Sequence, residues 1–286
     1  MIALIDRVKK VLDQNNLCVI ISLDFRKAFD SIPREQLLEK MKTVYKISDY
    51  WLRNNLSDRY QYVCSGDQKS ALIQNVAGVP QGSILGPVLF SLYINDLPKI
   101  VRHGHPGLFA DDSNFCFIGK NDKMQELQDN INADMHTIVE WSKENGLHLN
   151  QSKTVMLLIS RSHSVDEIKK ISVNIDGVQI FSSEEMKSLG LIIDHRLSWS
   201  SHINNVAKKC YLRICQLYTI KQYVRVEDLQ TLGQAIVYSL LHYMNAIWGY
   251  STKKNLKTVK KILRSLAGLI FSKLKYDPVS QLMYFK

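Results

Sequence analysis

Acidic residues stand at the edges of two strongly apolar segments. Asp24 follows the apolar run IISL, and Asp111 and Asp112 lie within LFADDSNF at 108–115. An ionised carboxylate beside a buried strand is costly unless a cation or hydrogen bonds compensate for it. Because carboxylate oxygens suit Mg²⁺, two such sites on neighbouring strands predict a divalent-metal site. An isolated Asp-Asp pair would more often be a polar hairpin turn, so its surroundings must decide.

The chemistry open to such carboxylates is phosphoryl displacement. Two metal ions about 3.5–4 Å apart can activate a hydroxyl and stabilise a leaving pyrophosphate during an in-line attack at phosphorus. This chemistry requires both acidic segments to lie side by side in one sheet.

The elements that must position these acids follow from hydrophobic periodicity. Residues 17–25 are almost wholly apolar, as in a strand buried on both faces. We expect Asp111 and Asp112 in the turn of a hairpin at 108–117. The further expectations for this region are helices at 34–45, 50–59, 85–101 and 122–145, and strands at 61–65, 71–79, 154–160, 172–180 and 187–193.

From residue 202 onward the pattern is helical only. The fold class is therefore α+β, with a mostly antiparallel sheet packed on helices followed by a helical, basic domain. We place a sheet domain at 1–198 and a helical domain at 199–286.

Charge is distributed unevenly along the chain. The formal net charge is +10, yet residues 201–286 alone carry eleven Lys and three Arg against three acidic residues, a net of +11. A basic third beside a near-neutral body favours a polyanionic partner, although a solvated lysine-rich surface explains the charge equally well. The cations that share one helix face are Lys253, Lys257, Lys260, Lys261 and Arg264.

Neither of the two long uncharged stretches predicts a membrane span. Residues 71–95 contain three glycines and two prolines, and residues 229–252 contain several polar side chains. The five cysteines form no C-x-x-C pair, which favours buried free thiols over a zinc site. We therefore expect no membrane partner.

Five sequence segments, taken together and in their order along the chain, resemble the motifs of a known protein family. Any one of them alone would be weak evidence. They are LDFRKAFDSI at 23–32, GVPQGSILGPVLFSLYINDL at 78–97, LFADD at 108–112, GLHLNQSKT at 146–154 and KSLGLIIDHRLSWSSHI at 187–203. Together they resemble the successive palm motifs of reverse transcriptases of the LINE type, the non-long-terminal-repeat (non-LTR) retrotransposons. The fold implied is a polymerase palm followed by a helical thumb, with most of the N-terminal fingers missing.

The resemblance implies a role for each acidic residue. Asp24, Asp111 and Asp112 would form the metal-binding catalytic triad, with the backbone carbonyl of Phe25 as a further ligand. Phe29 matches the steric gate that excludes a ribose 2′-hydroxyl, although a core phenylalanine would look the same in the sequence. Asp30 is expected to be structural.

The remaining motifs imply substrate contacts. Gln81 would line the nucleotide site, and Gly82 would let the backbone approach substrate closely. Lys153 would donate a proton to pyrophosphate. Residues 189–199 would form the primer grip, and the basic helices beyond would cradle an RNA–DNA hybrid.

The implied activity is RNA-directed DNA polymerisation from dNTPs, with an RNA template, a DNA primer and two Mg²⁺ ions for which Mn²⁺ can substitute. Two other interpretations stay open. The chain could be a catalytically silent, nucleic-acid-binding remnant, or a relative with the same palm chemistry, such as an RNA-dependent RNA polymerase or a group II intron maturase. The FADD form at 109–112 and the segment at 187–203 favour the LINE type. The sequence carries no localisation signal, and a nuclear site is only what the family resemblance implies.

Overall fold

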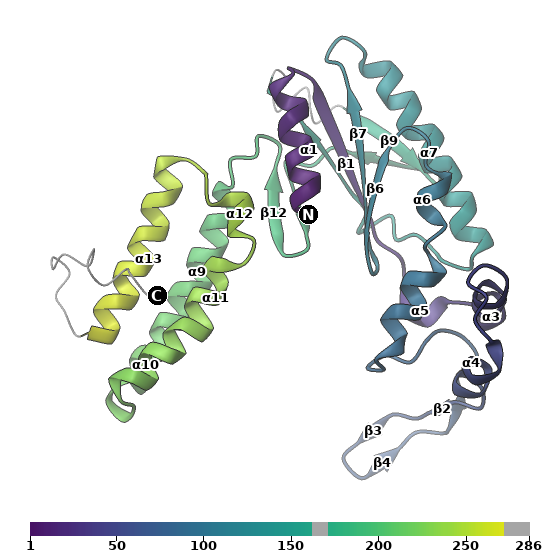
Figure 1. Cartoon of the computed structure of the whole chain (residues 1–286), viewed down its shortest axis with the longest axis horizontal. Coiled ribbons are helices and arrows are strands. Elements are labelled where there is room, and N and C mark those ends of the chain that lie inside the picture. The colour runs from purple at the N-terminus through teal and green to yellow at the C-terminus, as the bar shows by residue number, and fades with distance from the viewer. Residues whose placement is uncertain (162–170, 272–286) are drawn as a thin grey trace. The chain divides into compact units, whose positions relative to one another are not determined.

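The computed structural model describes residues 1–161 and 171–271 (Figure 1). The chain divides into two compact units, one comprising Met1 and 6–184, the other comprising 2–5 and 185–286. Each unit has a core of its own, so each is described by itself.

The first unit is built on a four-stranded antiparallel sheet in the order β6-β7-β1-β8. The bounds of its strands are β1 Leu17–Leu23, β6 His105–Phe109, β7 Asp112–Gly119 and β8 Val155–Ile159. As expected for a central strand, β1 is apolar and buried along nearly its whole length. The sheet thus holds together segments more than a hundred residues apart in the sequence.

The two faces of this sheet are covered differently. Alternate residues such as Val19, Ile21 and Phe115 enter the main core, which helix α7 (Met124–Glu144) also lines. On the other face lie Cys18 and Cys116, whose Sγ atoms are 3.1 Å apart. Both are free thiols buried in the protein, as their sequence context predicts.

Helix α7 confirms the amphipathic helix expected at 122–145. Its buried stripe includes Leu127, Ile131, Met135 and Ile138, spaced by three or four residues. The chain leaves the helix through Gly146, whose φ is +65°, a left-handed conformation in which glycine is favoured. The helix therefore ends where the sequence indicated.

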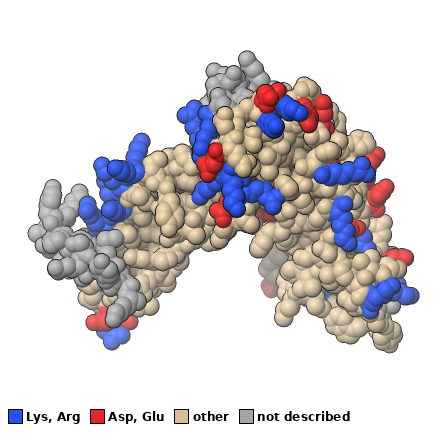
Figure 2. All heavy atoms as spheres, turned by 45° about the horizontal axis from the view of Figure 1, so that its top comes forward, with Lys and Arg blue, Asp and Glu red and all other residues tan. Residues whose placement is uncertain are grey.

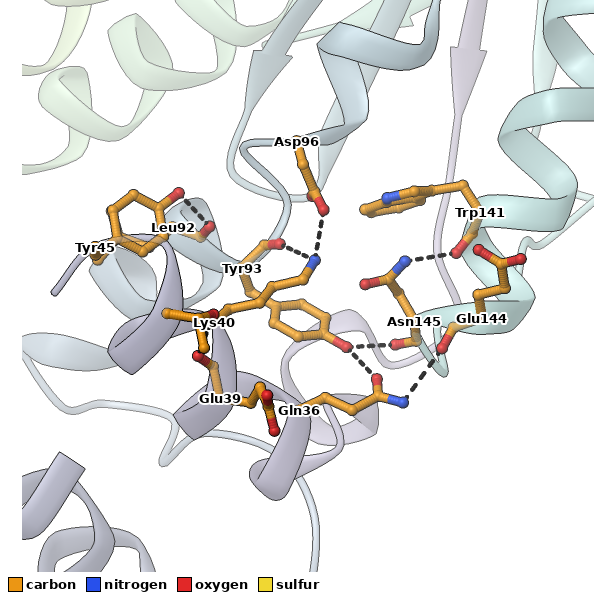
Figure 3. Close-up of polar contacts among 11 residues, drawn as sticks. Gln36, Glu39, Lys40, Tyr45, Leu92, Tyr93, Asp96, Trp141, Glu144 and Asn145 are labelled. Carbon is orange, nitrogen blue, oxygen red and sulfur yellow. Dashed lines mark hydrogen bonds and ion pairs between the residues drawn. The ribbon is translucent and has the colours of Figure 1, made fainter. Parts of the chain in front are cut away.

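A network around Lys40 joins three helices of this unit: α3 (Arg34–Thr43), α5 (Leu85–Tyr93) and α7 (Figure 3). Its ammonium donates to the Tyr93 carbonyl at 2.9 Å and to Asp96 at 2.8 Å, and it lies 4.4 Å from the centre of the Tyr93 ring. The Tyr93 hydroxyl in turn donates to the Asn145 carbonyl at 2.7 Å. Because these groups are largely withdrawn from water, the network fixes how the helices pack.

The segment between β1 and α5 is mostly short elements. They are α2 Ala28–Ser31, α3, α4 Asp49–Leu56, β2 Tyr60–Gln61, β3 Cys64–Ser65, β4 Gln68–Lys69 and β5 Ile73–Gln74. The pairs β2–β5 and β3–β4 form a hairpin where strands were expected at 61–65 and 71–79, with strands shorter than the sequence suggested. All four strands are exposed, so no core contacts extend them.

Three expected elements are divided in the structure. The helix predicted at 85–101 is interrupted after Tyr93, and α6 (Leu97–Ile100) begins again with Pro98 in its first turn, where a missing N–H costs nothing. The single strand predicted at 172–180 is a hairpin of β9 (Ser172–Ile175) and β10 (Val178–Phe181). Its turn residues, Asp176 and Gly177, both have positive φ, the signature of a tight hairpin turn.

The segment predicted as one strand at 187–193 is likewise a hairpin, β11 (Glu185–Ser188) and β12 (Leu191–Asp194), turning at Leu189-Gly190. It belongs to the second, otherwise helical unit. The helices of that unit are α9 Ser200–Ile220, a 3₁₀ turn Lys221–Tyr223, α10 Val226–Gly233, a π-helical segment Gln234–Tyr238, α11 Ser239–His242, α12 Asn245–Trp248 and α13 Lys253–Phe271.

Polar contacts explain why this hairpin joins the helices. The Asp194 carboxylate accepts the backbone N–H groups of Ser198 and Trp199 at 2.9 and 2.8 Å, ahead of α9. The Tyr243 hydroxyl donates to the Leu189 carbonyl at 2.6 Å. The units consequently divide between residues 184 and 185, earlier than the boundary placed at 198–199 from the sequence.

The structure confirms the α+β class, with an antiparallel sheet packed on helices and a helical unit after it. The sequence reading had not identified α1 (Ile2–Asp13). Among the described residues, no helix is long and apolar enough to cross a membrane.

Candidate active site

A tight hairpin presents the adjacent acids. Phe109 of β6 pairs with Asp112 of β7, so only Ala110 and Asp111 form the turn. Ala110 has a φ of +51°, which suits the first central residue of a two-residue hairpin turn. Asp111 is therefore exposed at the tip, whereas Asp112 is half-buried in the first position of β7.

The pairing of β1 with β7 brings the third acid alongside. Leu23 of β1 pairs with Ser113 of β7. Because the strands are antiparallel, Asp24, the residue after Leu23, lies at the same end of the sheet as Asp112, the residue before Ser113. Burial, then the negative charges of Asp111 and Asp24, raise the pKa of Asp112. Asp111 and Asp24 are thus close enough to disfavour the ionisation of Asp112.

The segment around Asn150 fixes Asp24. The Asn150 side-chain amide donates to Oδ2 of Asp24 at 2.9 Å, and the Asn150 backbone N–H donates to the Asp24 carbonyl at 2.7 Å. The ammonium of Lys153 lies 3.9 Å from the same Oδ2 atom. A turn in which Lys153 and Thr154 donate to the Asn150 carbonyl supports this arrangement. Lys153 therefore lies beside Asp24, one of the candidate catalytic acids.

A cavity of about 500 Å³ lies beside these groups. The expected site residues that line it are Asp24, Phe25, Phe29, Gln81, Asp111 and Lys153. Asp112 and Gly82 are not among the residues that line it. The structure thus brings six of the eight catalytic and substrate-binding residues predicted from the sequence to one cavity.

The position of Phe29 is compatible with both roles that the sequence left open, a core phenylalanine and a steric gate beside the nucleotide. Its ring stacks on Phe90 with centroids 4.6 Å apart and packs against the main core. It also lines the cavity. Because the ring is only partly buried, one side contacts the core while another part remains available to a ligand.

The segment at 78–82 lies directly on the segment that follows Asp24. The Val79 N–H donates to the Phe29 carbonyl, and the Gln81 amide donates to Asp30 at 2.9 Å. The carboxylate of Asp30 is thus the acceptor for the Gln81 side chain. Gly82 has a φ of +80° and open space where a Cβ would point.

Four further residues line the cavity without having been singled out from the sequence: Arg26, Lys27, Ala28 and Asn150. The two cations directly follow Phe25, and Asn150 lies inside the motif at 146–154, so the sequence did carry a signal. Their type was less telling than that of the acids, because exposed cations and amides are common.

No three His, Cys, Asp or Glu side chains of the described residues lie close enough together to enclose a metal ion by themselves. The donor chemistry is nevertheless suitable. Asp24, Asp111 and Asp112 offer carboxylate oxygens, which suit a divalent cation. Burial, and then the charges of Asp111 and Asp24, raise the pKa of Asp112, and a cation bound there would offset those charges. The Phe25 side chain has no donor atom, so only its backbone carbonyl could contribute.

The predicted basic face lies on helix α13. In Figure 2, Lys and Arg side chains gather over this part of the helical unit. The five cations named above are all exposed, whereas Ile262, Leu266 and Ile270 of the same helix are buried in the core of the unit. The helix is therefore basic on one side and apolar on the other.

Residues 2–193 match the family described as reverse transcriptase (RNA-dependent DNA polymerase), and the chain belongs to this family. Its curated relatives include the probable RNA-directed DNA polymerases from transposon BS and transposon X-element of Drosophila melanogaster, which are 26% and 24% identical. These alignments cover 88% and 93% of the chain, but 29% and 30% of the relatives.

The RNA-directed DNA polymerase from mobile element jockey of Drosophila funebris is 24% identical over 86% of the chain and 28% of its own length. The chain thus spans less than a third of the length of each of these three relatives. These relatives support the non-LTR assignment that the five motifs predicted.

Solved structures of telomerase from Candida tropicalis are also similar. The complex with a fragment of telomeric RNA is 13% identical, with a TM-score of 0.48, over 99% of this chain and 51% of that one. An apo form truncated from the C-terminal domain is 17% identical, with a TM-score of 0.46, over 68% and 38%. Similarities this distant carry no argument about function.

Proposed function

We propose that this chain catalyses RNA-directed DNA synthesis, transferring a nucleotide from a dNTP to the 3′-hydroxyl of a primer on an RNA template. The primer 3′-oxygen bonds to the α-phosphorus while the bond to pyrophosphate breaks. The observation that most supports this proposal is that Asp24, Asp111 and Lys153 line one cavity, where the charges of Asp111 and Asp24 also act on Asp112.

Each residue of the cavity has a proposed task. Asp24, Asp111 and Asp112, with the Phe25 carbonyl, would hold two divalent ions, Mg²⁺ or Mn²⁺. Bound there, the metal would supply activation of the hydroxyl and neutralisation of the leaving group.

Lys153 would stabilise pyrophosphate and donate a proton to it, since a cation beside a departing phosphate favours its release. Asn150 would keep the Asp24 carboxylate oriented through its 2.9 Å hydrogen bond. Gln81 would contact the incoming nucleotide, and Gly82 would allow close approach of backbone to substrate.

Phe29 would select the sugar by excluding a 2′-hydroxyl. Phe29→Ala is expected to lower the preference for deoxynucleotides over ribonucleotides in an extension assay with each nucleotide supplied alone. Phe90→Leu is the matched control, because it disturbs the stacking partner of Phe29 without reaching the cavity. If Phe29→Ala extends primers with unaltered preference, Phe29 is a core residue only.

Helix α13 would bind the phosphate backbone of an RNA–DNA hybrid. Its exposed cations would do so while the opposite side stays packed on the core of its unit. The proposed contact residues are Lys253, Lys257, Lys260, Lys261 and Arg264.

The decisive experiment is primer extension on an RNA template with dNTPs and Mg²⁺. The wild-type chain is compared with Asp111→Ala and with Asp129→Ala, which removes an exposed carboxylate of α7 away from the cavity. Extension by the wild type and by Asp129→Ala, lost in Asp111→Ala, is the expected result. Equal extension by all three would refute the assignment of the carboxylates.

A second candidate function is nucleic-acid binding without catalysis, which the exposed basic face of α13 favours. Its test uses the same proteins in a hybrid-binding assay. A folded wild-type chain that binds the hybrid and extends no primer, with either Mg²⁺ or Mn²⁺, would establish this second function in place of the first.

A further inference from the structure

Arg34, the first residue of α3, contacts the segment that leads into the cavity although it does not line the cavity itself. Its guanidinium makes four hydrogen bonds, all to residues 75–78. Nε donates to the Gly78 carbonyl at 3.1 Å, and Nη2 donates to the Ala77 carbonyl at 3.2 Å and to Oδ1 of Asn75 at 3.1 Å. Nη1 donates to the Asn75 carbonyl.

This cation has no carboxylate partner among the described residues. Burial lowers the pKa of Arg34, and the positive charge of Arg59 lowers it further. Carbonyl dipoles and one amide oxygen are what balance its charge. A planar fork with five donors can reach four acceptors in one short segment, and a lysine ammonium with three donors on a flexible stem cannot.

The opposite side of the same segment is fixed by backbone bonds. The Gly78 N–H donates to the Ile32 carbonyl and the Val79 N–H to the Phe29 carbonyl, both at 2.8 Å. A Cβ on Gly78 would lie 2.6 Å from Cα of Asp30, so the two backbones are in direct contact. Residues 75–79 are thus held between Arg34 and the segment that carries Phe29.

We infer that Arg34 is a positioning residue for nucleotide selection: by fixing residues 75–78 it sets where Phe29 and Gln81 face the nucleotide. This inference rests on the proposed function, since it assigns a selective role to the same cavity. Without the fork, only the backbone bonds of Gly78 and Val79 hold the loop against the segment that carries Phe29, so the loop moves more freely and the wall that would meet the 2′-position of the sugar shifts. A displacement of about 1 Å at such a wall is enough to change rates about a hundredfold.

The test compares Arg34→Lys, which keeps the charge and loses the fork, with Arg34→Gln, which keeps a planar donor pair. Arg102→Lys is the matched control, because Arg102 is exposed in the same unit and lies away from the cavity. Hydrogen exchange at residues 76–83 reports the loop, and exchange in β1 reports whether the unit is folded. Extension kinetics with dNTPs and rNTPs report selection.

With β1 still protected, Arg34→Lys is expected to speed exchange at 76–83 and to raise KM for dNTP. The preference for dNTP over rNTP should fall by about tenfold, which is about 1.4 kcal/mol. Arg34→Gln should lie between Arg34→Lys and the wild type, and Arg102→Lys should match the wild type.

Two results overturn the inference. Unchanged exchange at 76–83 in Arg34→Lys would show that Arg34 does not hold the loop. Faster exchange with unchanged KM and unchanged nucleotide preference would show that its role is structural alone. A wild-type chain that extends no primer would instead fail the proposed function, and the exchange measurement keeps the two failures distinct.

Discussion

Replacing Gly78 by alanine tests whether the contact between residues 78–79 and 29–32 is as close as the structure has it. Gly78 has a φ of +77°, and an added Cβ would lie 2.6 Å from both Cα of Asp30 and the carbonyl oxygen of Phe29. The left-handed conformation costs an L-residue about 1–2 kcal/mol. Forcing a methyl group against backbone atoms that cannot rotate away costs about 1–3 kcal/mol more.

Gly82 supplies the matched control for stability. Its φ of +80° is nearly the same, yet nothing lies within 4 Å of the position of an added Cβ. Gly82→Ala should therefore lose about 1–2 kcal/mol, the conformational cost alone. Gly78→Ala should lose about 2–5 kcal/mol, the sum of both costs.

The measurement is native-state hydrogen exchange of β1 amides, because it reports the stability of the first unit without a contribution from the second. Equal losses for Gly78→Ala and Gly82→Ala would refute the steric argument. In the extension assay, Gly78→Ala should also extend primers more slowly than the wild type at a temperature where both are folded, since the clash displaces Phe29 and Asp30.

Three further outcomes are expected. Burial, and then the charges of Asp111 and Asp24, raise the pKa of Asp112 in the folded chain, so the ionised carboxylate destabilises the fold. Asp112→Asn should therefore raise the urea midpoint of unfolding at pH 7. This gain in stability should disappear below about pH 4, where the carboxyl group is protonated in both the folded and the unfolded chain. Asn150→Ala removes the hydrogen bond to the Asp24 carboxylate, whose side chain is 37% exposed. Because of that exposure, the loss should correspond to the lower end of the free-energy range for hydrogen bonds to charged groups, so kcat should fall by about tenfold with hybrid binding unchanged. A variant of α13 in which Lys253, Lys257 and Lys260 are neutralised should bind the hybrid with a weaker salt dependence. The slope of log K against log salt concentration should become shallower by about 0.7–0.9 for each lysine that contacts phosphate. An unaltered slope would show that this face is only a solvated surface.

Local patterns determined much of the fold. The apolar run at 17–23 is a buried strand because few polar atoms interrupt it, and the stripe of α7 repeats every three to four residues, as one buried helix face requires. The hairpin that carries Asp111 was visible for the same reason. These features depend on neighbours in the sequence, so the sequence suffices to find them.

Where a tight turn divides a segment, the alternation of polar and apolar residues led to a wrong prediction of a single strand. Residues 172–180 alternate in polarity as one strand would, yet Asp176 and Gly177 reverse the chain. Asp-Gly is a hairpin signal in its own right. It was outweighed because the residues on both sides continue the strand-like composition.

Residue types and the order of the motifs were enough to identify the candidate site residues, since chemistry of this kind needs particular side chains. These candidates are the acidic triad, Phe29, Gln81, Lys153 and the basic face of α13. Tertiary structure alone decided which side chain fixes Asp24, because Asn150 lies 126 residues away and no local pattern pairs an amide with a distant carboxylate. It also decided that Arg34 holds residues 75–78, since hydrogen bonds to backbone carbonyls leave no trace in the identity of the residues that accept them. Residue chemistry is written in the sequence, whereas the distances between such residues arise only when the sheet and helices pack.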